Sequence, residues 1–473
     1  MKKIVLTLTA LAVLWSCNDD YLDISREDKI PVDQFFQDED DAVAATNAMY
    51  TNLRSWEVAA FASFIITIAS DNAEKGSSPG DASFFNDINN FTYTSSAFII
   101  NDYWKGQWRG VNLANQVITN IPPIEMDENL KNRLLGEAHF IRALHYFNLV
   151  RTFGGVPVYD GLPADGNYNV PRNTEQEVYE FIIADLTFAG SNLPASYDAT
   201  NLGRATMGAA KAYLAKVYMY QENWGQALTL TNEVMGMGYD LLEDYNSVFR
   251  IPNENSVESI FEAQATYVDG NCDFSNSQYS ETQGVRGQYG WGFNVPTQDL
   301  ADFFEAGDER RDATIIFRGE TTPEGDFINE TGDNPMYNQK SYVPSGLLGN
   351  CSPGSEQNIR LMRFAEVLLI NAEAANEMGD TDLALSSLNR VRNRAELADF
   401  DSADPTAIRA AIWRERRAEL AMESDRFWDV VRQGRGEEVF GPLGFSAGRN
   451  EVFPIPFEAI SLSNGVLTQN PGY

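Results

Sequence analysis

The residues best suited to chemistry are aromatic and polar side chains that alternate between positions 267 and 293. The aromatic members are Tyr267, Phe274, Tyr279, Tyr289, Trp291 and Phe293. The polar members between them are Asn271, Asp273, Asn276, Gln283, Arg286 and Gln288. An aromatic ring offers a flat apolar face to a sugar ring, and amide, carboxylate and guanidinium groups beside it bind hydroxyl groups. The pattern favours a sugar-binding surface; the alternative is that some of these rings, Trp291 included, fill the core of a small irregular lobe.

The usual signatures of catalysis are missing from the sequence. Its two histidines, His139 and His145, are six residues apart on one predicted helix, so they point from different faces and do not form a two-histidine metal site. We expect His145 to pack in the core. The sequence has no HExxH, CxxC or P-loop motif. Its 68 acidic residues leave a glycoside hydrolase possible without indicating any catalytic pair. We therefore predict no catalytic residues, no cofactor and no transition-metal site, and leave a calcium site open.

Composition narrows the class of protein further. The 473 residues carry 35 basic and 68 acidic side chains, a formal net charge of −33. Such a surface disfavours nucleic acid, because phosphate binding needs clustered Lys and Arg. It also disfavours adsorption to anionic lipid. With 43% apolar residues the chain has ample material for a packed core.

The first residues have the composition of a secretory signal. Lys2 and Lys3 precede an uncharged, mostly apolar run to Trp15, which is too short to span a bilayer. The run ends before Cys17, which resembles the lipidated cysteine of bacterial lipoproteins, so we predict a signal peptide at 1–16 and lipidation of Cys17. An ordinary signal peptide with a chance cysteine is the alternative. The acidic stretch after Cys17 resembles surface-export signals of such lipoproteins, with a solvated tail as the alternative. Whether Cys272 and Cys351 pair is left open.

The elements that must position these side chains are mostly helices in antiparallel pairs. Apolar residues at helical spacing, with capping residues and Gly or Pro at the ends, predict helices over 42–53, 103–121, 130–152, 175–189, 206–221, 361–378 and 383–394, and a partner helix after 223. Superposing 227–228 on 384–385 also superposes Ala215 on Ala372. This resembles tetratricopeptide repeats, with generic helical hairpins as the alternative. Residues 70–102 and 245–355 are rich in Gly, Asn, Ser and aromatic residues, so we predict a long loop and an irregular lobe. The predicted fold is dominated by α-helices, with the ligand-binding lobe carried on the helical scaffold.

Several ordered stretches together resemble the SusD/RagB family of outer-surface lipoproteins. They are GEAHFIRA at 136–143, RTFGGVP at 151–157, GRAT at 203–206, GWG at 290–292, LMRFAEVLL at 361–369, RRAELA at 416–421, RFW at 426–428, PIP at 454–456 and QNPGY at 469–473. The resemblance implies four tetratricopeptide-like pairs and an irregular lobe that bears the ligand surface. It also implies that the protein is held at the outer membrane by a lipid anchor only and faces the cell exterior. The partner that it implies is a SusC-like TonB-dependent transporter. Members of the family mainly capture glycans, or in some branches peptides, without catalysis.

These motifs are mostly scaffold, so the ligand contacts are predicted from position and chemistry. We expect loops 70–102 and 267–293 to form the binding face. Its predicted stacking residues are Tyr279, Tyr289 and Trp291, and its predicted polar contacts are Asp71, Asn72, Asp81 and Arg286. After the signal at 1–16 we expect two regions, 17–240 and 241–473, the second with the lobe 245–355 and helical repeats over 356–435. Glycan capture is the first functional hypothesis, peptide capture the second and a surface hydrolase the third.

Overall fold

The computed structural model describes residues 35–268, 271–348 and 355–473. The predicted signal peptide, Cys17 and Cys351 lie outside these residues. The long helices are α3 (Glu39–Leu53), α5 (Phe98–Asn120), α6 (Glu128–Phe153), α7 (Glu175–Asn192), α8 (Met207–Tyr220), α9 (Trp224–Met235), α13 (Phe364–Glu377), α14 (Thr381–Arg394) and α15 (Pro405–Leu420). The short ones are α4 (Phe85–Asn89), α10 (Tyr279–Gln283), α11 (Gln298–Phe303), α12 (Arg310–Thr314), α16 (Arg426–Arg432), α17 (Gly436–Phe440) and α18 (Phe457–Leu462). The prediction of a fold dominated by helices is confirmed.

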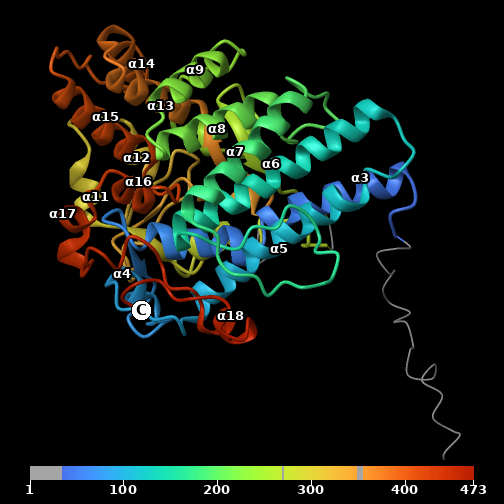
Figure 1. The fold of residues 1–473 in the computed structure, drawn as a ribbon. Helices are drawn as coiled ribbons and strands as arrows, with labels where there is room; N and C mark the ends of the chain where they lie inside the picture. Colours follow the sequence, from blue (N-terminus) through green and yellow to red (C-terminus); the bar gives the residue numbers. More distant parts are fainter. Residues whose placement is uncertain (1–34, 269–270, 349–354) are drawn as a thin grey trace, which may run out of the picture.

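Several long helices begin where their capping residues predict. The Asp38 side chain accepts the Asp41 N–H, so the acidic cluster there is a helix start, as predicted. The predicted cap Thr206 likewise accepts the Ala209 N–H at the start of α8. Helices α6 with α7, α8 with α9 and α13 with α14 pack as pairs. Figure 1 shows these pairs and α15 as one continuous array, with α4, α18 and the C-terminus together on its other side.

Two predicted boundaries are wrong. The helix predicted from Leu361 begins at Phe364, because residues before it form strand β6 (Ile359–Arg363). β6 pairs antiparallel with β2 (Ser259–Ala263), which takes up the backbone groups that a helix would need. The helix predicted from Tyr103 begins at Phe98, and the loop before it contains α4 and strand β1 (Ala73–Gly76).

The irregular lobe leaves the helical array and returns to it through short strands. The β2–β6 pair joins the start of the lobe to the residues that follow it. Within the lobe, β4 (Ile315–Phe317) pairs antiparallel with β5 (Met336–Asn338). Strand β3 (Phe293–Pro296) instead pairs with β1 from the N-terminal region. The lobe also has small apolar clusters of its own, so it is a packed body beside the main helical core.

A buried charge cluster fastens the lobe and the C-terminal helices together. Glu419, in the last turn of α15, accepts hydrogen bonds from Arg363 of β6 at 2.8 Å and from Arg310 of α12 at 3.2 Å. Arg394 of α14 donates to the same carboxylate. The Glu419 backbone carbonyl accepts a further bond from Lys340 at 2.9 Å. Burial alone would raise the pKa of Glu419, but Arg394, Arg363, Arg310 and Lys340 together hold it far below its ordinary range.

His145 is part of the core, as predicted. Its Nδ1 lies 2.7 Å from Gln107 Oε1, and helix α5 approaches so closely that a Cβ at Gly110 would stand 2.0 Å from the imidazole. Burial lowers the pKa of His145 from 6.5 to about 3. Gly110 is thus required by this close approach, and the ring is neutral at physiological pH.

The buried imidazole predicts a loss of stability in acid. Between pH 6.5 and the folded-state pKa, the unfolded chain binds a proton that the folded chain excludes, so stability falls as pH falls. At 1.36 kcal/mol per pH unit the loss from this group reaches about 2 kcal/mol at pH 5. Urea unfolding at pH 7 and pH 5 should show His145→Asn losing about 2 kcal/mol less than the wild type over that interval. Equal losses of stability in the two proteins between pH 7 and pH 5 would rule out His145 as a cause of the acid sensitivity.

Candidate functional site

The two loops predicted to form the binding face are joined by a strand pair. β1 lies near the start of the first loop, β3 begins where the second loop ends, and Gly76 stands opposite Phe293 in their register. The Ser77 N–H donates to the Gly292 carbonyl at 2.5 Å, which continues the contact beyond the strands. Gly292 has φ of +73°, and a Cβ there would stand 2.8 Å from that of Arg286. The residue after Trp291 is therefore constrained to glycine by conformation and by space.

A polar cluster lies where these loops meet. Arg286 donates from Nη1 to Asp81 Oδ2 at 3.0 Å and to the Trp291 carbonyl at 3.1 Å, and also to the Ser77 hydroxyl. Asp333 lies 3.4 Å from its Nε. The hydrogen bond from Ser77, together with the Arg286 charge, lowers the pKa of Asp81, which keeps this carboxyl ionised. Three predicted site residues, Asp81, Arg286 and Trp291, thus lie together.

An aromatic strip runs from this cluster onto the N-terminal helices. We define it by its five rings in spatial order: Trp291, Trp56, Phe61, Phe98 and Phe84. Successive ring centroids lie 6.3, 5.3, 6.4 and 4.9 Å apart. Phe61 is buried, but Phe98 is 49% and Phe84 42% exposed. The two exposed rings, Phe98 and Phe84, contact each other, and the half-buried Trp291 joins the strip to Arg286. Together these residues provide the apolar faces and the polar groups that a sugar needs.

The other two predicted stacking residues are not members of the strip. Tyr289 is half-buried and packs edge-on against Tyr342 at 5.8 Å, in one of the apolar clusters of the lobe. Burial, with the charge of Asp326, raises the pKa of Tyr289. Tyr279, the first residue of α10, packs on the main core and lines a small inner cavity of about 100 Å³.

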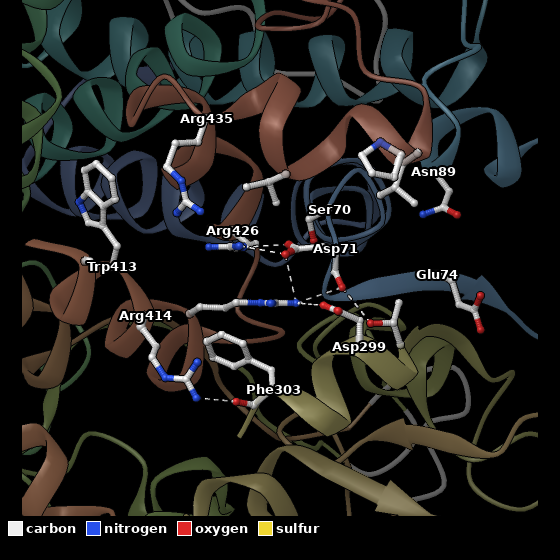
Figure 2. A pocket seen from close by; sticks show the side chains of 16 residues that line it. Ser70, Asp71, Glu74, Asn89, Asp299, Phe303, Trp413, Arg414, Arg426 and Arg435 are labelled. Carbon is white, nitrogen blue, oxygen red and sulfur yellow. Dashed lines mark hydrogen bonds and ion pairs between the residues drawn. The ribbon is translucent and has the colours of Figure 1, made fainter. Parts of the chain in front are cut away.

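Asp71 and Asn72 lie at a separate cavity of about 800 Å³, which we call the arginine pocket (Figure 2). Its defining residues are Arg414, Arg417, Arg426 and Arg435 with Phe303 and Trp413. Asp71 accepts hydrogen bonds from Arg426 at 2.8 and 2.9 Å. Burial alone would raise the pKa of Asp71, but Arg426 and Arg417 lower it. Asn72 is fully buried, and its Oδ1 accepts from Arg417 Nε at 2.9 Å, so its side chain supports the wall of the pocket instead of facing a ligand.

Sequence reasoning missed Trp56 and Phe98 of the strip. Trp56 begins a π-helical turn, η2 (Trp56–Ala60), closely followed by a second one, η3 (Ser63–Thr67). Such turns are rare and frequent at functional sites, but nothing in the local spacing indicates one. The available signal for Phe98 was its place in the aromatic-rich loop. The part of the chain that the structure describes has no helix long and apolar enough to cross a membrane and no cluster of side chains arranged to hold a metal.

Comparison with known proteins identifies the family. Residues 257–444 match the model of the SusD family, and residues 20–219 match a model described as starch-binding and associating with the outer membrane. SusD-like protein P2 of Formosa agariphila is 31% identical over 519 aligned residues, which cover all of both chains. A SusD-like protein of Bacteroides ovatus is 29% identical, over 91% of this chain and 82% of its own length.

Solved structures agree with these relatives. A laminarin-binding SusD-like protein superposes with a TM-score of 0.82 and 30% identity, covering 92% of this chain and all of its own. A SusD-like protein from Bacteroides fragilis superposes with a TM-score of 0.81 and 27% identity, covering 94% of this chain and all of its own. The shared fold, the two family matches and the full-length relative lead to one conclusion: this chain belongs to the SusD family.

Proposed function

We propose that this chain is a non-catalytic glycan-binding lipoprotein of the outer membrane, and that the aromatic strip with Arg286 and Asp81 is its binding face. The strip carries the proposal, because it places exposed rings beside a fixed arginine and an ionised carboxylate. A relative of 30% identity that binds laminarin supports a glycan as ligand. Anchoring through Cys17, exposure to the cell exterior and delivery to a SusC-like TonB-dependent transporter belong to the same proposal.

Native affinity electrophoresis of residues 18–473 against soluble polysaccharides, laminarin among them, tests this function. We expect at least one polysaccharide to slow migration, because stacked rings and hydrogen bonds hold the protein on the polymer. Reducing-sugar release, measured in the same mixtures, should stay at the level of the polymer alone. Unchanged migration with every polysaccharide would contradict glycan capture, and peptides would be tested next. Release of sugar would identify a hydrolase instead.

A further inference from the structure

The arginine pocket gathers four guanidinium groups in a chain of net charge −33. Asp71, Glu74 and Asp299 line it as well, and Glu305 and Glu438 pair with Arg414 and Arg435 from beside it. We propose that this pocket binds an anionic group, a carboxylate or a sulfate ester, carried by a sugar. The inference rests on the proposed function and extends it, because it makes acidic glycans the ligand class.

The two inner arginines, Arg417 and Arg426, are each held by hydrogen bonds that leave one guanidinium nitrogen without a partner among the described residues. Arg426 uses Nε and Nη2 on Asp71. Arg417 uses Nε on Asn72 and Nη2 on Asp299 and Asp71. Within the described residues, Nη1 of each has no hydrogen-bond partner. Because the acids and the amide already fix both guanidinium planes, little conformational entropy is lost when these remaining donors meet an anion.

The two outer arginines complete the donor set. Arg414 donates from Nη2 to the Phe303 carbonyl at 2.9 Å, and Arg435 donates from Nη2 to Glu438 at 2.7 Å. Neither Nη1 has a hydrogen-bond partner in the ranges that the structure covers. Figure 2 shows Arg426 and Arg435 beside Trp413, with Arg414 turned toward the Phe303 carbonyl. Guanidinium groups gathered in one pocket suit a carboxylate or sulfate, whose oxygens accept several charge-assisted bonds.

The walls beside these donors suit a sugar ring. Trp413 is fixed by a hydrogen bond from Nε1 to Glu373 at 2.9 Å, and Arg435 lies 5.6 Å from its ring centroid. Phe303 lies on another wall of the same cavity. The pocket also adjoins the aromatic strip through β1, because Glu74 lines the pocket and Ser77 contacts Arg286.

The test compares three polymers with one backbone: dextran, carboxymethyl dextran and dextran sulfate. In affinity electrophoresis of residues 18–473 at low salt, we expect a charged form to slow migration at a concentration at least tenfold lower than dextran. The double variant Arg414→Gln and Arg435→Gln should need at least tenfold more of that polymer than the wild type. Both side chains are solvent-accessible, so circular dichroism should show an unchanged fold. The matched control is Arg390→Gln on α14, because the exposed Arg390 side chain pairs with Asp240.

The outcomes separate this inference from the proposed function. A preference for carboxymethyl dextran or for dextran sulfate identifies the anionic group. Charged polymers that bind no better than dextran, or a double variant that binds as the wild type does, overturn the pocket assignment. In that case glycan binding through the aromatic strip is still tested separately, by the panel of soluble polysaccharides and by variants of the strip. Charge-dependent binding that survives in strip variants supports the pocket as a separate contact.

Discussion

Alanine at both Trp291 and Phe98 is expected to weaken glycan binding by at least about 100-fold, since buried aromatic contacts at the centre of a site often carry about 2 kcal/mol each. Trp291 is the end of the strip that comes from the lobe, and Phe98, at the start of α5, is the fourth of its five rings. Their loss leaves the Arg286–Asp81 pair in place and removes the apolar faces between which a sugar chain lies. Affinity electrophoresis or calorimetry with the polysaccharide that slows the wild type measures the effect.

The control for this variant is Tyr168→Ala. Tyr168 is 48% exposed, close to the 49% of Phe98, and its ring contacts Tyr159, which lines a separate cavity with Trp108. It therefore removes an exposed ring of similar accessibility without touching the strip. Binding by the double variant that stays within about threefold of the control, with an unchanged circular dichroism spectrum, would contradict the assignment of the strip.

The helical array could be predicted from the sequence because its signals are local. A cap such as Thr206 is recognised from its own neighbours, and a helix pair requires only two apolar faces and a short turn between them. The start of α13 could not be predicted in this way. Leu361 continues the helical spacing of the residues after it, but its backbone belongs to β6, whose partner β2 lies about a hundred residues earlier. Non-local strand pairing overrode a correct local pattern.

The candidate site could be predicted from the sequence only where loop composition indicates it. The aromatic-rich loops do meet, and they bring Asp81, Arg286 and Trp291 together. Asn72 shows the limit, because the partner that buries it, Arg417, is 345 residues away in the chain. A polar residue in a glycine-rich loop is typical of a ligand contact, yet here the long-range pair makes it part of the scaffold. Trp56 was missed for a related reason: its neighbour Trp291 comes from a different region of the chain.

Replacing Glu419 by glutamine is expected to lower the free energy of unfolding by about 3–5 kcal/mol, the usual effect of removing one member of a buried ion cluster. The substitution keeps the size and shape of the side chain. It leaves Arg310, Arg363 and Arg394 buried with less negative charge to balance them. Urea unfolding at pH 7 measures the change. The matched control is Glu233→Gln, which breaks a single solvent-exposed pair with Lys211 and should cost less than about 1 kcal/mol.

The pH dependence of this difference tests whether charge is its cause. The folded-state pKa of Glu419 is depressed, so its ionisation stabilises the protein above the ordinary pKa of 4.5, and that contribution is lost as pH falls toward the folded value. The gap between wild type and Glu419→Gln should therefore be complete at pH 7 and shrink below pH 4.5. A gap that stays constant down to pH 3 would indicate lost packing instead of lost charge. Because Glu419 lies two residues after Arg417 on α15, loosening of this cluster should also weaken the arginine pocket. The rings of the aromatic strip all lie outside α15, so the strip should keep its affinity.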